Sequence, residues 1–583
     1  MGALLRKQIV LPLLLALVLV SPSVFTGLQL DDYYHWGLVS ENPLAQPGDD
    51  TAGIFTLFTF LDGNPARTQA LVDKGMLPWW TLRDVKYMFW RPLSEITHGI
   101  DYLLWPHQPV LMHLHSLVYF ALLLLATYAV LQRWLSGSAL KWAYWIFCLS
   151  YTHGFAAGWL ANRNAVLASL FVALTLYCHD RWRQEKQQRF HGFGVLCFVL
   201  GLLCGEIGVS GGLLLFAYAL CYERRYDQSP FLARYFQRLL TIGVYGASGI
   251  VWLLLRGLMG YGAEGSGHYV DPTQLGHFLA TVSERYVLLM NGLFWSLPPE
   301  FAGLFGSRVP IVVALIGFGC LGYVVAPLLR AQPLARFSSL GVLLLLLPVC
   351  ATHPHSRLLI AASMPMAILT GLYLGVRAKQ PNVSQRWLSK AMRVMLVVCL
   401  LGLSPLLLVF ESVQMKLVMD GILNKGAKAL QIAPDQEHKI HVILNPPVSS
   451  VAGYIQGVRA YHGLNTATAV IPLVSALGEV QLLIDEDGRI EMANPRGLYE
   501  ASQESLLRAP SRALRQGDTL TVAGIMATVL AVNGDGIPTH AAFEFPANRA
   551  DYVFHLWHGS EPRQCTLSPP GTRITLTQAT ESC

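Results

Sequence analysis

Long apolar runs separated by short polar segments dominate the first 411 residues of the chain. A helix needs about 20 mostly apolar residues to cross the hydrocarbon core of a bilayer. The pattern therefore predicts eleven membrane-spanning helices, at 8–28, 111–132, 141–160, 164–179, 192–207, 208–222, 239–258, 311–329, 337–352, 358–376 and 392–411. The first run is interpreted as an uncleaved helix, because no clear small-x-small cleavage site follows it.

The distribution of basic residues predicts the orientation. The N-terminus and the segments 133–141, 180–191, 223–238, 330–336 and 377–393 hold 19 Lys and Arg, against five in the short outside connections. Cytoplasmic loops carry the excess of Lys and Arg. The N-terminus is therefore predicted to be cytoplasmic and the C-terminus to lie outside. The apolar segment 276–297 is read as a re-entrant or interfacial helix, because a span there would invert every later loop.

Composition narrows the class of protein. Of 583 residues, 53% are apolar and 13% charged, whereas a soluble domain carries about 25% charged residues. This excludes a soluble enzyme, a disordered chain and a nucleic-acid binder. The net charge of +6 reports cytoplasmic Lys and Arg rather than an anionic partner.

Two large pieces are predicted outside the membrane. Loop 29–110 is rich in Trp, Tyr and Pro and is expected to lie against the membrane surface, where amphipathic rings are favoured. The sequence thus divides into a transmembrane domain, 1–411, that includes this loop, and an extracytoplasmic domain, 412–583.

The tail is predicted to be a small α+β domain. An amphipathic helix over 412–433 leaves the membrane, and 441–444 and 449–461 are a strand and a helix. Two hairpins are predicted, one turning at Asp485–Gly488 and one between 519–532 and 539–545. Cys565 and Cys583 either form a disulfide or remain two free thiols.

An acidic pair, Asp31 and Asp32, directly follows the first apolar run. Two carboxylates at a membrane boundary need water, a cation or a partner. One of them could be a general base for an acceptor, or help to hold a divalent cation. The alternative is that they simply end the helix in water, although an acid at a helix C-terminus opposes the macrodipole.

Further polar residues adjoin the apolar runs on the predicted outer side. Arg91 and Lys86 could contact a lipid phosphate, and ionisable groups at membrane depth are functional candidates. The alternative is ordinary loop polarity, or packing in the case of a lone His. The remaining candidates are Asp101, His113, His115, Arg163, Glu206, His353, His355 and Arg357.

The order and spacing of these residues resemble the GT-C glycosyltransferase superfamily, which includes protein O-mannosyltransferases, oligosaccharyltransferases and lipid A aminoarabinose transferases. The resemblance covers about residues 1–411. It rests on the acidic pair after the first helix, the long first outer loop, and the stretch Phe89-Trp-Arg-Pro-Leu-Ser followed by Asp101-Tyr and His113-Leu-His-Ser116. The Arg-bearing outer segments Asn162-Arg163-Asn164 and Ser356-Arg357 add to it. One departure is Gly205-Glu206, where relatives often have Lys-Glu.

The resemblance implies a GT-C-like helical membrane protein that transfers a sugar from a polyprenyl-phosphate or polyprenyl-diphosphate carrier to a glycan, lipid or protein acceptor on the outer face. Asp31 or Asp32 would be the base or a metal ligand, and metal dependence is left open. The donor phosphate would be bound by Arg357, His355, Arg163, Arg91 and Lys86, with Glu206, Asp101 and His115 in support. A bacterial inner membrane with a periplasmic tail is the expected location.

Two other functions compete with this one. A flippase or transporter of a lipid-linked sugar would also need outer-face cations and a lipid groove, although such proteins often show inverted repeats and midplane charges, which this sequence does not. A non-catalytic assembly partner would use the periplasmic tail to bind another protein.

Overall fold

The computed structural model describes residues 2–40, 53–223, 230–270, 275–305, 308–375, 383–500, 504–546, 549–577 and 583. The chain forms two compact units. Unit 1 consists of Met1–Gly27, Trp90–Gly260 and Asp271–Met415, and unit 2 of Leu28–Phe89, Tyr261–Val270 and Lys416–Cys583. Each unit is assembled from segments far apart in the sequence.

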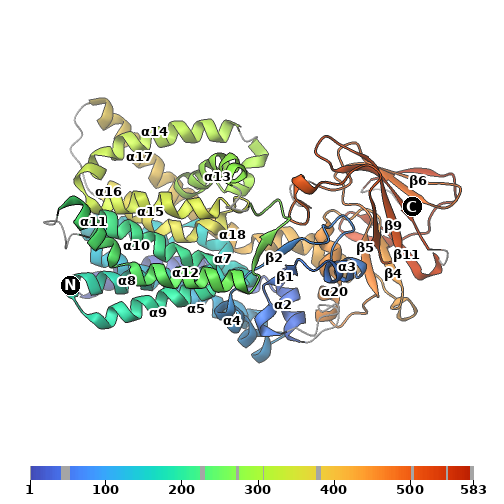
Figure 1. Ribbon diagram of the computed structural model, residues 1–583, viewed down its shortest axis with the longest axis horizontal. Helices are drawn as coiled ribbons and strands as arrows, with labels where there is room; N and C mark the ends of the chain where they lie inside the picture. Colours follow the sequence, from blue (N-terminus) through green and yellow to red (C-terminus); the bar gives the residue numbers. More distant parts are fainter. Residues whose placement is uncertain are drawn as a thin grey trace. The chain divides into compact units, whose positions relative to one another are not determined.

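Unit 1 is a helical bundle (Figure 1). In it α8 packs against α5 and α9, α6 against α16, and α15 against α10 and α16. Apolar side chains from most of these helices form one continuous core. The helices are α1 (Gly2–Val20), α4 (Pro92–Leu104), α5 (Pro109–Trp134), α6 (Gly137–Cys148), α7 (Gly154–Gly158), α8 (Arg163–Glu185), α9 (Gln188–Cys204), α10 (Val209–Cys221), α11 (Phe231–Leu240), α12 (Gly243–Leu258), α13 (Leu275–Trp295), α14 (Arg308–Ala331), α15 (Pro333–Val349), α16 (Ile360–Gly375), α17 (Val383–Val397) and α18 (Ser404–Met419).

The predicted polytopic helical architecture is confirmed, and each predicted span overlaps a helical segment. Within the described residues, five helices are long and apolar enough to cross a membrane, or six if the bent pair α11 and α12 is one span; four shorter helices are also apolar. The count of eleven spans stays a prediction. Helix α13 forms where the re-entrant or interfacial helix was expected.

The predicted span 141–160 is wrong as a single helix, because the chain breaks after α6 and resumes as the short helix α7. Two glycines bring α7 into direct contact with α18. A Cβ on Gly158 would lie 2.1 Å from the Ser412 carbonyl oxygen, and one on Gly154 would lie 2.6 Å from Glu411 Cβ. Only glycine permits so close an approach of two backbones. The break therefore serves packing against α18.

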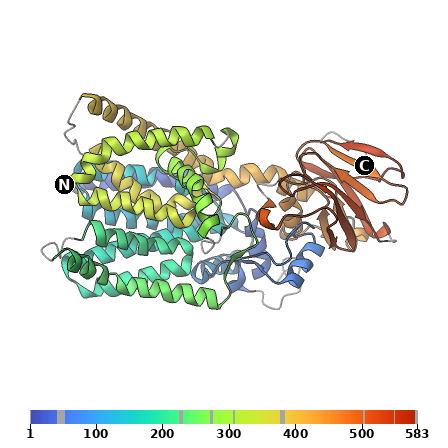
Figure 2. The ribbon, with the colours of Figure 1, turned by 45° about the horizontal axis from the view of Figure 1, so that its top comes forward.

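Unit 2 is an α+β domain, as predicted for the tail. Six antiparallel strands form one sheet in the order β13-β6-β7-β10-β9-β8, and a mixed sheet has the order β12-β11-β4-β5; the strands are coloured orange to red in Figure 2. The bounds are β4 (Ile440–Ile443), β5 (Ala469–Pro472), β6 (Val480–Ile484), β7 (Ile490–Ala493), β8 (Thr519–Val522), β9 (Ile525–Val532), β10 (Pro538–Glu544), β11 (Tyr552–His558), β12 (Glu561–Gln564) and β13 (Arg573–Leu576).

The tail predictions hold with one correction. The hairpin at Asp485–Gly488 joins β6 and β7, and 449–461 is helix α20 (Ser449–Tyr461). The segment 519–532, expected as one strand, folds back at Ala523 and Gly524 into β8 and β9. Both turn residues have positive φ, 47° and 83°, as two-residue hairpin turns require. Cys565 and Cys583 form a disulfide.

Loop 29–110 does not stay with the transmembrane region. Its part Leu28–Phe89 belongs to unit 2, where it forms α2 (Asp31–Val39), α3 (Pro65–Asp73), β1 (Thr59–Asp62) and β2 (Lys86–Met88), the last pairing with β3 (Gly262–Glu264). Trp79 and Trp80 are fully buried in the core beneath the C-terminal strands. These indoles thus fill a protein core rather than an interface with lipid. The domain boundary at 411 stays a prediction; in this part of the chain unit 1 ends at Met415 and unit 2 begins at Lys416.

Candidate functional site

The acidic pair lies at the start of a helix, not at the end of one. Helix α1 ends at Val20, and Asp31 and Asp32 form the first turn of α2. Carboxylates at a helix N-terminus are stabilised by the positive end of the macrodipole. The unfavourable placement inferred from the sequence is therefore wrong. Leu30, which precedes the pair, has φ 45° and ψ −112°, so the backbone is strained where the two carboxylates begin.

The two carboxylates have different surroundings within unit 2. Asp32 is fully buried, and its Oδ2 accepts a hydrogen bond from the Gln29 backbone N–H at 2.9 Å. Asp31 is partly exposed, and its Oδ1 accepts a hydrogen bond from the Tyr454 hydroxyl on α20. A base must reach the acceptor's proton. The partly exposed Asp31 is better placed for that role than the buried Asp32.

Lys86 also belongs to unit 2 and has an acidic partner. It lies on β2, and its Nζ is 3.6 Å from the Glu264 carboxylate on the paired strand β3. The Lys86 side chain is 20% exposed. The neighbouring strand therefore offsets part of its charge.

In unit 1, Arg163 is the centre of a buried polar network. Its guanidinium donates to Ser116 Oγ at 2.8 Å, to the carbonyl oxygens of Thr97 and Met112 at 3.1 and 3.0 Å, and to the Asp101 carboxylate. Asp101 also lies 2.6 Å from His115 Nδ1. Arg163 is fully buried. All three of its nitrogens are engaged, so the network joins α4, α5 and α8 and leaves Arg163 poorly suited to binding a phosphate.

Arg91 and Glu206 form a second pair in unit 1. Arg91 Nε and Nη2 lie 3.0 and 2.9 Å from Glu206 Oε2. The side chains are 17% and 34% exposed. The residue before Glu206 is Gly205 and carries no charge, and the cation comes instead from Arg91 at the start of α4. Gly205 adjoins the pair, since a Cβ there would lie 3.5 Å from Arg91 Nε.

The segment His355–Arg357 begins the short 3-10 turn that leads into α16. His355 Nδ1 accepts from the Arg357 backbone N–H at 3.3 Å. Because that N–H can only donate, the ring proton is on Nε2. Burial, followed by the charge of Arg357, lowers the pKa of His355 well below its usual value. The ring is therefore a neutral donor at Nε2, the form that can hydrogen-bond a phosphate oxygen.

The Arg357 side chain is the exception among the candidate cations. Its guanidinium lies over the Phe155 ring, 5.9 Å from the ring centre, and it is partly buried. Within the described residues the structure contains no hydrogen bond or ion pair from this guanidinium to another side chain. Arg163, Arg91 and Lys86 each have a carboxylate partner. Arg357 is thus the candidate most in need of an anion.

A carboxyl pair beside this segment was missed in the sequence. Glu411 Oε2 accepts from Ser356 Oγ at 3.0 Å, and Glu300 Oε2 accepts from the Ser356 backbone N–H at the same distance. Glu300 Oε1 lies 3.5 Å from His355 Nδ1, and burial raises the pKa of Glu300. Glu411 sits within an apolar run, and that isolation was the one available signal. The pair holds Ser356 from two sides and so fixes the backbone beside Arg357.

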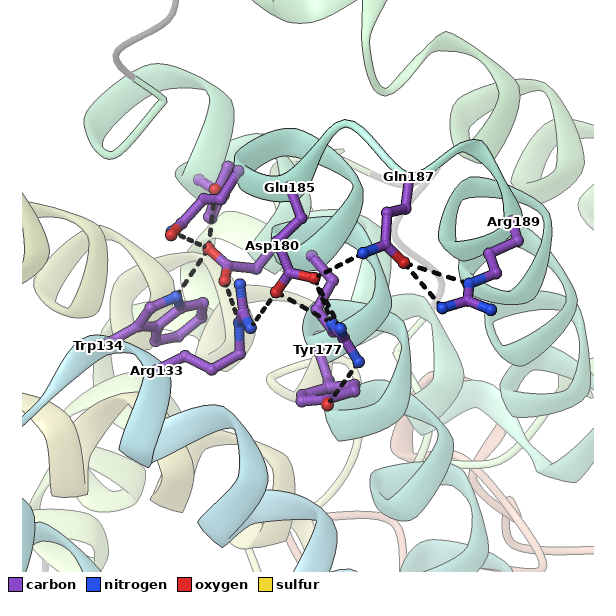
Figure 3. A network of polar contacts seen from close by, with 10 residues as sticks. Arg133, Trp134, Tyr177, Asp180, Glu185, Gln187 and Arg189 are labelled. Carbon is purple, nitrogen blue, oxygen red and sulfur yellow. Dashed lines mark hydrogen bonds and ion pairs between the residues drawn. The ribbon is translucent and has the colours of Figure 1, made fainter.

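Another polar network lies at the other end of α8. Asp180 accepts from Arg133, Trp134 and Tyr218, and Glu185 bonds Arg133 and Arg181 (Figure 3). Asp180 is 17 residues from Arg163 on the same helix, or about 25 Å along its axis. Arg133, Asp180 and Tyr218 bond to one another across helices, so this network ties the ends of α5, α8 and α10 together.

No metal ligand is assigned. In the described part of the chain no group of three or more His, Cys, Asp or Glu is arranged to hold a metal ion. His113 bonds Thr26 and the Gly27 carbonyl, each at 3.1 Å, which is the packing role expected of a lone His.

No family model and no curated protein matches the chain. Among solved structures it is similar to ArnT from Cupriavidus metallidurans in the apo state, with 13% identity and a TM-score of 0.42 over 78% of this chain and 84% of that one. It is also similar to an Archaeoglobus fulgidus oligosaccharyltransferase in the apo form, with 13% identity, a TM-score of 0.41 and coverage of 81% and 65%. It is similar as well to the archaeal oligosaccharyltransferase AglB from Archaeoglobus fulgidus in complex with an inhibitory peptide and a dolichol-phosphate. The identity is 11% and the TM-score 0.41, over 79% of this chain and 64% of that one. At this level of similarity no activity is carried over to the chain.

Proposed function

We propose that the protein is a membrane glycosyltransferase that moves a sugar from a polyprenyl-phosphate or polyprenyl-diphosphate carrier to an acceptor on the outer face of the membrane. The observation that carries the proposal is Arg357, a partly buried guanidinium for which the described residues supply no carboxylate. A cation in such a place is costly without an anion. The phosphate of a lipid carrier supplies one.

The segment around Arg357 supports the same role. His355 offers an Nε2–H donor beside the guanidinium, and Glu300 and Glu411 brace Ser356 between the two. Donors held in place in this way stabilise charge that develops on a leaving phosphate. Arg163 is reassigned in this proposal: with Asp101 and His115 it supports the framework. Arg91 with Glu206, and Lys86, stay secondary candidates for the phosphate.

Asp31 is proposed as the base. The acceptor's oxygen or nitrogen attacks the anomeric carbon as the bond from that carbon to the phosphate oxygen breaks. The Asp31 carboxylate takes the acceptor's proton, and the electron pair of the broken bond leaves with the phosphate. Arg357 and the His355 Nε2–H then offset the added negative charge. Asp32, buried and bonded to the Gln29 N–H, shapes the turn that presents Asp31.

Native mass spectrometry of the purified protein tests the proposal. We expect the wild type to retain a polyprenyl phosphate, Arg357→Ala to lose it, and Asp31→Asn to accumulate the sugar-loaded carrier. Asp32→Asn is the matched carboxylate control. Equal lipid in all four proteins would favour a flippase. No polyprenyl lipid in any of them would overturn the donor assignment and favour an assembly role for the tail.

A further inference from the structure

One side chain of the C-terminal domain contacts the acidic pair. Helix α20 presents Tyr454, whose hydroxyl donates a hydrogen bond to Asp31 Oδ1 across 423 residues of sequence. Both residues belong to unit 2. The contact is therefore internal to one compact body, and the tail takes part in building the surroundings of Asp31.

Neighbouring contacts fix α2 against α20 and against the segment Asp420–Asn424. Tyr33 donates to Asn424 Oδ1 at 3.1 Å, and its ring meets Tyr461 edge to face at 5.6 Å. Trp36 packs against the same Tyr461 ring at 5.2 Å. On α2, Tyr33 and Trp36 lie two and five residues after Asp31, and on α20, Tyr461 lies seven residues after Tyr454. These contacts hold the Tyr454 hydroxyl in a defined position next to the Asp31 carboxylate.

The electrostatics keep the phenol a donor. Burial, and next the charge of Asp31, raise the pKa of Tyr454 well above its usual value of 10.0. Burial and then Asp31 also raise the pKa of Tyr87. The charge of Asp31 thus acts on both phenols, and Tyr454 donates a hydrogen bond to it. Asp32 differs, because its Oδ2 accepts a hydrogen bond from a backbone N–H.

We infer that Tyr454 is a positioning residue for Asp31, so that the C-terminal domain is a working part of the transfer site and not a separate acceptor-binding appendage. The inference rests on the proposed function. The phenol holds Oδ1 and so orients the carboxylate toward the acceptor. A hydrogen bond to the charged form also favours that form, which keeps Asp31 ready to accept a proton.

The test compares Tyr454→Phe with Tyr33→Phe, which removes only the hydroxyl that donates to Asn424, keeps the ring contact with Tyr461 and does not touch Asp31. The probe is the sugar-loaded carrier that co-purifies with the protein, discharged by adding envelope extract from the same cells. We expect Tyr454→Phe to slow discharge by about tenfold or more, the worth of a hydrogen bond to a charged group. The acidic limb of the pH–rate profile for discharge should move to higher pH, because the lost hydrogen bond favoured the charged form of Asp31. Tyr33→Phe should change neither.

A second readout does not depend on activity. Thermal unfolding of Tyr454→Phe, Asp31→Asn and the double variant measures whether the two residues are coupled. Non-additive shifts in Tm together with the altered pH profile support the inference. Discharge by Tyr454→Phe that matches Tyr33→Phe in rate and pH profile overturns it. A third outcome separates the inference from the proposed function. If the Tm shifts show coupling but neither the wild type nor Asp31→Asn carries a sugar-loaded lipid, the contact between Tyr454 and Asp31 exists. The proposed function then fails, and the positioning role fails with it.

Discussion

The Arg91 guanidinium lies 2.9 Å from the Glu206 carboxylate, 115 residues further along the chain. The pair gives Glu206 the cation that its immediate sequence lacks. It also joins the start of α4 to the turn between α9 and α10. We expect Glu206→Gln to lower stability by about 1 kcal/mol, as for a partly exposed ion pair, and Arg91→Lys to lose part of the same energy.

A double-mutant cycle on Tm in detergent checks this, with Arg91→Gln and Glu206→Gln as the two arms. Additive effects of the two substitutions would show that the pair contributes nothing to folding.

The Arg163 network predicts a much larger effect. Asp101→Ala leaves a fully buried guanidinium without its carboxylate, and breaking a buried pair costs about 3–5 kcal/mol. We expect a marked fall in Tm and in yield. Ser116→Ala, which removes one neutral contact of the same guanidinium, should cost only about 1 kcal/mol. Equal effects of the two substitutions would contradict a charge-centred network.

The contact of α7 with α18 predicts that Gly158 tolerates no side chain. A Cβ there would meet the Ser412 carbonyl at 2.1 Å, so Gly158→Ala must push the two backbones apart. We expect the Tm to fall and Glu411, which lies beside Ser412, to be displaced. Gly192→Ala is the control, because nothing would lie within 4 Å of a Cβ at this residue and Ala favours the helix by up to about 1 kcal/mol. A harmless Gly158→Ala would disprove the close approach.

Two buried histidines make unit 2 sensitive to acid. His441 Nδ1 and His555 Nε2 lie 2.8 Å apart on paired strands, and neither ring is exposed. Burial lowers the pKa of both from 6.5, and that of His555 to about 3, with His441 as the second cause. Since the folded state holds both rings neutral, their full contribution to the stability of the fold is present above pH 6.5. It is lost as the pH falls below that value, by about 1.4 kcal/mol per pH unit for each proton taken up.

Chemical denaturation between pH 7.5 and 4.5 measures this dependence. His555→Asn should flatten the acidic fall relative to wild type, whereas His558→Asn, on the same strand but partly exposed, should not. Parallel pH curves for all three proteins would refute the prediction.

Hydropathy and turn residues were enough to locate the long apolar helices of unit 1 and the strands β4, β6, β7 and β10 of the tail, because these depend on local periodicity. The helix α4 and the strands β5, β11, β12 and β13 were not predicted. Hydropathy could not show that Trp79 and Trp80 fill the core of unit 2, since an aromatic-rich outer loop looks the same in sequence whether it meets lipid or protein. The position of Asp31 was misread for a local reason: the apolar run continues to residue 30, whereas α1 ends at Val20 and a strained Leu30 starts a new helix.

The partners of the candidate residues were beyond the sequence. Tyr454, Glu300 and Glu411 reach their partners only through the fold, and no spacing rule links Glu206 to Arg91. The chemistry of the candidates could be predicted residue by residue. The sequence could not show which of the candidate cations are paired with a carboxylate in the fold. That difference distinguishes Arg357 from the other candidates.

The most direct test of the account is a binding titration of the purified protein with a polyprenyl phosphate and with the matching neutral polyprenol. If Arg357 binds the donor phosphate, the wild type prefers the phosphate by about tenfold or more in Kd, as expected for a charge-assisted contact. Arg357→Ala then loses that preference and keeps its affinity for the polyprenol, whereas Arg91→Ala retains most of the preference. An Arg357→Ala protein that still distinguishes phosphate from alcohol as well as the wild type would contradict the central claim.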